Sequence, residues 1–176
     1  MDAKFISALQ GNIASRSIGA STARGMGPKG TVAAARNYLA KLRLSRIHGL
    51  SEKQFKHWMN RKTIDFQSKL PRGGRHWGSA RKFLNIFLRH VVYNRFLCEA
   101  FNLYLIEPWL EVPLDSHVAK ELRKEPEGSA LPGWKTVVGL DRNTSEFYQE
   151  VASKIGARKG LSRVHLDVFY WRLGSI

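Results

Sequence analysis

Two residues of this chain have the type and the setting that amine chemistry requires. Lys82 lies in the apolar segment W77-G-S-A-R-K-F-L-N-I-F-L-R, and Asp115 lies in the phrase V112-P-L-D-S-H-V. A lysine among Leu, Phe and Ile has a weakly hydrated ammonium, which gives up its proton more readily than a solvated one. A neutral amine is a nucleophile and a Schiff-base former, and a neighbouring carboxylate can take up a proton or stabilise a developing cation.

Both residues also have a plainer interpretation. Lys82 can extend out of an apolar helix to meet a phosphate, because its aliphatic stem tolerates apolar surroundings. Asp115 follows a proline-rich turn, where an aspartate is typically the N-cap of a helix. Both interpretations stay open from the residues alone.

The distribution of charge points to a polyanionic partner. The formal net charge is +15 over 176 residues, and residues 1–50, 51–95 and 96–176 carry net charges of +7, +9 and −1. Such asymmetry is typical of a surface that contacts a phosphate backbone, so we expect a nucleic-acid partner and, with Lys82, chemistry on it.

Composition excludes several other classes. The hydrophobic fraction of 43% indicates a folded protein. The single cysteine, Cys98, forms no internal disulfide and no cysteine-rich metal site, so we expect no metal and no cofactor. No apolar run reaches the roughly 18 residues that a membrane span needs. We expect an intracellular monomer without membrane contact.

Periodicity predicts an all-α fold. Residues 11–30 are rich in Gly and Ser and have no helical or strand period, so residues 1–30 are interpreted as a basic arm and residues 31–176 as one α-helical domain. The final apolar segment, 161–173, fits strand or helix, and we expect helix because alternating segments are absent elsewhere. Helices are expected from Thr31 (with Leu44 and Ile47 as an extension), from the capping box Ser51-Glu-Lys-Gln54, at Thr63–Leu70, around Lys82 to about Val92, through Phe101 and Leu105, from Asp115 or Ser116, and from Thr144 or Ser145.

Three segments of the chain resemble a known superfamily in order and spacing. The Lys82 helix, the phrase Pro113-Leu-Asp-Ser-His-Val and the ending V164-H-L-D-V-F-Y-W resemble helix-hairpin-helix DNA glycosylases, in particular the archaeal 8-oxoguanine DNA glycosylases. The 33-residue interval from Lys82 to Asp115 is similar to that of the archaeal group. The resemblance covers roughly residues 75–176 and implies a helix-hairpin-helix glycosylase-like bundle.

The resemblance also implies an activity on double-stranded DNA. Such enzymes extrude a damaged or modified base into a pocket. Lys82 would attack the anomeric carbon of that nucleotide, Asp115 would stabilise the cationic sugar and assist deprotonation of the lysine, and β-elimination from the Schiff base would nick the strand without a cofactor. Asp167 would hydrogen-bond the edge of the base and Trp171 would stack on its face.

The chain departs from the family pattern at one position and offers a competing motif at another. The family has an aromatic residue four positions after the lysine, whereas this chain has Ile86, which puts recognition of 8-oxoguanine in doubt. G25-M-G-P-K-G-T resembles the hairpin of commoner members and would nominate Lys29 as the nucleophile. The next acid is Glu52, which is at the wrong interval, so we interpret this motif as a phosphate-binding turn at most.

DNA contacts are expected from the glycine-rich turn before the Lys82 helix and from two nearby positions. Backbone N–H groups of such a turn can bind a phosphate. The residues expected to contact DNA are Arg72, Gly73, Gly74, Arg75, His76, Arg81 and His117. The competing functions are a DNA-binding module of the same fold without catalysis and an RNA-binding protein, because composition alone permits both.

Overall fold

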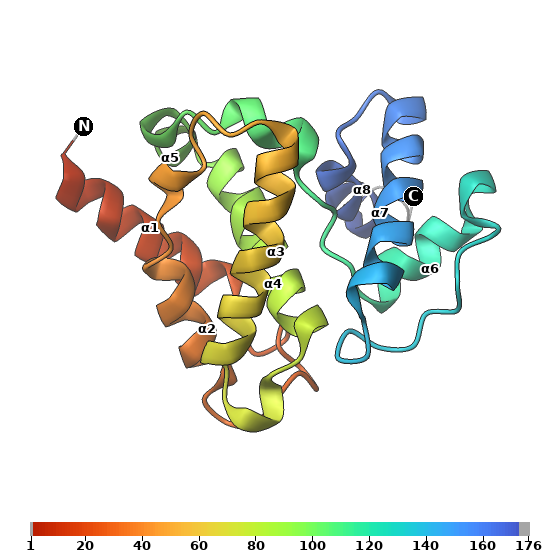
Figure 1. Ribbon diagram of the computed structural model, residues 1–176, viewed down its shortest axis with the longest axis horizontal. Helices are drawn as coiled ribbons and strands as arrows, with labels where there is room; N and C mark the ends of the chain where they lie inside the picture. Colours follow the sequence, from red (N-terminus) through yellow and green to blue (C-terminus); the bar gives the residue numbers. More distant parts are fainter. Residues whose placement is uncertain (1, 173–176) are drawn as a thin grey trace.

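The protein consists of helices joined by turns. The computed structural model describes residues 2–172, and within that range it contains no β-strand (Figure 1). The α-helices are α1 (Ala3–Ser17), α2 (Thr31–Ala40), α3 (Glu52–Lys69), α4 (Trp77–Tyr93), α5 (Arg95–Phe101), α6 (Ser116–Lys124), α7 (Arg142–Lys159) and α8 (Leu166–Arg172). The 3-10 helices are η1 (Leu44–Arg46), η2 (Arg72–Gly74), η3 (Tyr104–Trp109), η4 (Pro126–Gly128) and η5 (Arg163–His165). The prediction of an all-α fold is confirmed.

The helix ends follow the capping chemistry in the sequence, with two differences. Ser51 and Gln54 form the predicted capping box at the start of α3. This helix continues unbroken to Lys69, so the separate short helix from Thr63 is wrong; the Thr63 hydroxyl donates to the carbonyl of Met59 within the helix. Helix α7 is capped by Asp141, whose side chain accepts from the N–H of Thr144, and not by Thr144 or Ser145.

The N-terminal segment is not an arm over most of its length. Residues 3–17 form α1, which packs against α2, α4 and α5. Ile6 and Ala14 are buried, and the buried amide of Gln10 donates to the carbonyls of Leu39 and Leu42 at 3.0 and 2.8 Å. The prediction failed because the buried face of α1 consists largely of small and polar residues, which give little apolar periodicity. Residues 18–30 form turns.

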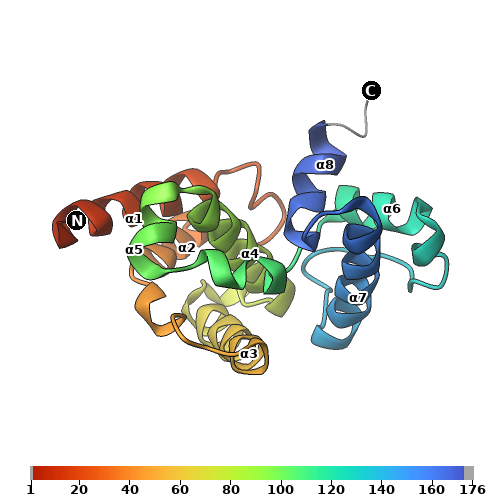
Figure 2. The ribbon, with the colours of Figure 1, turned by 90° about the horizontal axis from the view of Figure 1, so that it is seen from above.

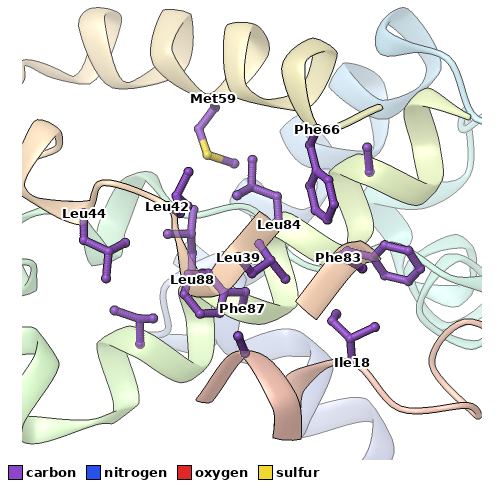
Figure 3. Packing of buried hydrophobic residues seen from close by; sticks show 14 of the residues in the cluster. Ile18, Leu39, Leu42, Leu44, Met59, Phe66, Phe83, Leu84, Phe87 and Leu88 are labelled. Carbon is purple, nitrogen blue, oxygen red and sulfur yellow. The ribbon is translucent and has the colours of Figure 1, made fainter. Parts of the chain in front are cut away.

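Buried apolar side chains form two clusters, which define two lobes. The larger cluster lies among α1–α5, where Figure 3 shows side chains of α2, α3 and α4 meeting around Leu39, Phe66 and Phe87. The smaller cluster lies among α6–α8 around Leu122, Tyr148 and Ile155. Figure 1 shows the two lobes side by side, with the segment after η3 passing from one to the other.

Close backbone packing joins the two lobes. Gly78, in the first turn of α4, faces the 137–140 loop so closely that a Cβ there would overlap the carbonyl oxygen of Val137 and lie 2.8 Å from Cβ of Leu140. Within the smaller lobe, the buried amide of Gln149 accepts from the N–H of Val112 and donates to its carbonyl, at 3.0 and 2.8 Å. These hydrogen bonds hold the segment that precedes α6 against α7.

Candidate active site

A cavity of about 540 Å³ lies where the two lobes meet. Its wall combines the end of α1 and the following loop, one face of α4, the N-terminus of α6, and α8. The lining residues are Ser17, Ser21, Thr22, Lys82, Ile86, Arg89, His90, Asp115, Asp167, Val168, Trp171 and Arg172. The cavity therefore collects all five of the residues expected to act on or contact a base: Lys82, Ile86, Asp115, Asp167 and Trp171.

Lys82 and Asp115 form an ion pair in this wall. The two residues are mostly buried, and Nζ of Lys82 lies 3.3 Å from Oδ2 of Asp115. The other oxygen of Asp115, Oδ1, accepts from the backbone N–H groups of His117 and Val118, both at 3.0 Å. Asp115 is thus the N-cap of α6 and the partner of Lys82 at once, and the positive end of the helix favours its charge.

A second ion pair, between Arg89 and Asp167, lies in the same cavity. Both side chains are about nine-tenths buried. Burial lowers the pKa of Arg89, only partly opposed by Tyr93. The Asp167 carboxylate, expected to read a base, therefore already has a cationic partner. Sequence reasoning missed Arg89, although its place seven residues after Lys82 puts it two turns along the same face of α4.

Trp171 lies at the edge of the cavity with 54% of its surface exposed. Its indole packs against the ring of His117, with centroids 4.2 Å apart and planes at 39°. His117 is half-buried and is held by a 3.2 Å hydrogen bond between its Nε2 and the carbonyl of Tyr170. His117 therefore packs against the indole and helps to hold it in place. The expected contact of His117 with DNA stays a prediction.

The N-terminal lobe contributes hydroxyl side chains to the cavity wall, which the sequence analysis did not predict. Ser17, Ser21 and Thr22 lie opposite α8, and the Ser17 hydroxyl is 2.8 Å from Nδ1 of His90. Burial, and after it the charge of Arg89, lowers the pKa of His90. This wall comes from the segment that was expected to be an arm, so its position depends on how α1 packs.

Arg81, which was expected to contact DNA, is buried and already paired in this fold, so the structure does not favour that contact. It is 4% exposed, and its guanidinium donates to both carboxylate oxygens of Glu111 at 2.7 and 2.5 Å and to the hydroxyl of Thr63. Burial alone would raise the pKa of Glu111, but the charge and hydrogen bonds of Arg81 hold it below its usual value. Adjacent helical positions point in different directions, so Arg81 braces the segment before Asp115 while Lys82 faces the cavity.

The glycine-rich turn at 72–76 is only partly available to a phosphate. Arg72 and Gly73 are exposed, but Gly74 is buried and its N–H donates to the carbonyl of Pro71 at 2.7 Å. The N–H of Gly74 is therefore not free to bind a phosphate, and the contacts expected of the other residues of this turn stay predictions. Nε of Arg75 donates to the carbonyl of Leu70, and Nε2 of His76 lies 3.2 Å from the carbonyl of Gly73.

The second glycine-rich segment, 25–30, packs directly on this turn. Gly27 has φ of +156°, and a Cβ there would lie 2.8 Å from Cα of Gly74, so the two backbones touch. Exposed Arg24, Lys29 and Arg72 consequently belong to neighbouring turns. Lys29 is absent from the cavity lining, whereas Ser21 and Thr22 of the same loop belong to it.

No three His, Cys, Asp or Glu side chains within residues 2–172 gather in a way that could hold a metal ion. No helix in that range is long and apolar enough to cross a membrane. Comparison of the chain with protein-family models, with curated proteins and with solved structures finds no match.

Proposed function

We propose that this protein is a DNA glycosylase with lyase activity that extrudes a damaged or modified base from double-stranded DNA and excises it through a Schiff base on Lys82. The observation that carries the proposal is the Lys82–Asp115 pair, 3.3 Å apart in the wall of a cavity that also holds Asp167 and Trp171. The all-helical architecture and the order of these residues agree with a helix-hairpin-helix glycosylase-like bundle.

The chemistry assigned to the pair is a displacement at the anomeric carbon. Asp115 takes a proton from the ammonium of Lys82, and the amine then forms a bond to C1′ as the glycosidic bond breaks and its electrons leave with the base. Asp115 then passes this proton to the departing base, and the carboxylate that is restored stabilises the positive charge that develops on the sugar. Ring opening gives the Schiff base, and loss of the C2′ proton expels the 3′ phosphate and nicks the strand.

Two features of the cavity favour a flipped base as its occupant. Trp171 is a half-exposed indole at the edge, where it can stack on one face of a base. Arg89 and Asp167 supply a donor and an acceptor at the far end of the α4 face, beyond Ile86. Ile86 stands where the resemblance leads one to expect an aromatic residue, so this position offers no second ring for stacking and does not favour 8-oxoguanine as the excised base.

The two glycine-rich turns, of which the 18–30 loop continues into the cavity wall, supply the proposed DNA contacts. Arg24, Lys29 and Arg72 are exposed there, and the 18–30 loop joins these cations to the cavity wall. Phosphate contacts of this kind position a duplex without reading its sequence. We therefore propose that DNA crosses these turns and delivers one nucleotide into the cavity.

Borohydride trapping tests the proposal. The wild type, K82M and K29M are incubated with duplexes that carry an abasic site or one of a panel of modified bases, and covalent complexes and nicks are scored. The wild type and K29M are expected to form the covalent complex, and K82M is expected to lose it completely. K29M is the matched control because it removes the lysine that the competing hairpin motif nominates.

The competing functions predict other outcomes. Tight binding of every duplex without trapping or nicking, even at an abasic site, would indicate a DNA-binding module without catalysis. Preference for structured RNA with no base release would indicate an RNA-binding protein. Trapping that survives K82M would reject Lys82 as the nucleophile. Circular dichroism of each variant verifies that loss of activity is not loss of fold.

A further inference from the structure

A cationic groove runs between α2, η1 and α3, separate from the cavity described above. It consists of two adjoining hollows of about 520 and 670 Å³, which share Arg43 and Lys62 in their walls. We call it the α2–α3 groove. Its Lys and Arg side chains are Lys41, Arg43, Arg46, Lys53, Arg61, Lys62 and Lys69.

The charge of the α2–α3 groove is almost uncompensated. Asp65 is its one acidic lining residue, and this carboxylate already accepts from the hydroxyl of Tyr38 and pairs with Lys62. Within residues 2–172, no carboxylate lies within 4.0 Å of any of the other six cations. Concentrated like charge destabilises a folded protein unless a counterion or a polyanion is nearby.

The cations of α3 that line the groove are spread over most of the helix. They are Lys53, Arg61, Lys62 and Lys69, and the rise along the helix axis from Lys53 to Lys69 is about 24 Å. Lys62 lines both hollows and so connects the cations of one with those of the other. A set of cations of this length matches a linear polyanion better than a small anion.

Trp58 also belongs to the residues that line the groove. It is 3% exposed, and its indole Nε1 has no hydrogen-bond partner among the described residues. Buried donors are normally satisfied, so this N–H is an exception in the wall of the groove.

The groove and the cavity lie on different sides of α4. Figure 2 shows α3 on one side of α4 and α8 on the other, and the two sets of lining residues have no member in common. A duplex that reaches the cavity across the glycine-rich turns therefore does not by itself fill the groove.

The apolar residues around the groove argue against a lipid surface. A helix that lies on a membrane combines cations with large exposed apolar side chains on its other edge. Of the exposed large apolar residues in the described part of the chain, Ile64 alone belongs to α2, η1 or α3. A phosphate backbone requires no such fringe.

We propose that the α2–α3 groove is a second nucleic-acid-binding surface, which holds the phosphate backbone of DNA on the side of the protein away from the cavity. This inference does not depend on any catalytic activity of the cavity. Its consequence is that the protein can hold two stretches of DNA, one at each surface.

The test is the salt dependence of binding to an undamaged, labelled duplex, measured by fluorescence anisotropy. It is made in an R24Q/K29Q/R72Q background, which removes exposed cations of the glycine-rich turns. Adding R46Q/K53Q/R61Q is expected to make the slope of log K against log salt concentration shallower by about 2.7, since each lost phosphate contact removes about 0.9. Affinity at low salt should fall more than tenfold.

The matched control adds K120Q/K135Q/K154Q to the same background. These lysines are exposed and lie outside the groove. Their substitution removes the same net charge as the substitution of the three groove cations. Equal effects of the two triple variants would overturn the proposal in favour of a general effect of net charge. It would also be overturned if the groove variant kept its duplex binding and instead lost co-sedimentation with phosphatidylserine vesicles.

Discussion

Lys82 and Asp115 belong to different lobes, yet Nζ of the lysine lies 3.3 Å from Oδ2 of the aspartate. The carboxylate cannot turn away easily, because its other oxygen accepts two backbone N–H groups at the start of α6. The lysine is held by a helix whose neighbouring side chains are buried on several sides. The proposed nucleophile and its proposed proton acceptor are thus held in place before any substrate binds, which is the arrangement that lowers the entropic cost of a reaction.

The two roles of Asp115 are separable by substitution. D115N keeps an oxygen for the N-cap but removes the charge, whereas D115A removes both. We expect both variants to lose strand nicking by a factor of roughly 100 or more, and D115A to be less stable than D115N by about 1 kcal/mol. Urea unfolding and single-turnover nicking measure these effects. Wild-type nicking by D115N would remove the carboxylate from the mechanism.

Arg89 and Asp167 are expected to depend on each other for stability. R89M leaves a buried carboxylate without its cation and should lower the free energy of unfolding by about 3–5 kcal/mol. R89M/D167N removes the stranded charge as well, so it should recover much of that loss. Urea unfolding of the wild type, both single variants and the double variant gives the coupling energy. Strictly additive effects would show that the pair contributes no interaction.

His90 makes stability depend on pH. Its pKa in the folded protein is lowered, by burial first and by Arg89 second, from an ordinary value of 6.5. The unfolded chain therefore binds a proton more readily at this residue, and the free energy of unfolding decreases as the pH falls below about 6.5. H90Q should flatten this part of the pH profile. H48Q, at an exposed position, is the control and should retain the wild-type profile.

Gly78 and Gly11 both lie in helices, but only Gly78 is in close contact with another part of the chain. A methyl group at Gly78 would overlap the backbone of Val137, so G78A is expected to destabilise the protein by about 1–3 kcal/mol and to weaken the joint between the lobes. Gly11 has no atom within 4 Å of the position of an added Cβ. G11A should therefore stabilise the protein by about 0.5–1 kcal/mol. Thermal unfolding of both variants tests the contrast.

The caps at several helix starts could be predicted from the sequence. Ser51 and Gln54 bracket a helix start, and Asp115 follows a proline-rich turn, so the positions of these caps depend on hydrogen bonds between neighbours in the chain. The helical character of the last segment also followed, up to Arg172, where the described residues end. Lys82, Asp115, Asp167 and Trp171 were nominated from residue type, spacing and the resemblance to glycosylases.

Contacts between distant segments could be decided only by the tertiary structure. Arg81 and Lys82 are neighbours of similar charge, yet Glu111 buries one while Asp115 draws the other to the cavity wall. A linear pattern likewise does not show the pairing of Arg89 with Asp167, the packing of α1 through Gln10, or the meeting of cations from several elements in the α2–α3 groove. Helix capping and periodicity act within a few residues, whereas burial, ion pairing and long-range hydrogen bonds depend on which helices meet, and that is settled by packing of the whole chain.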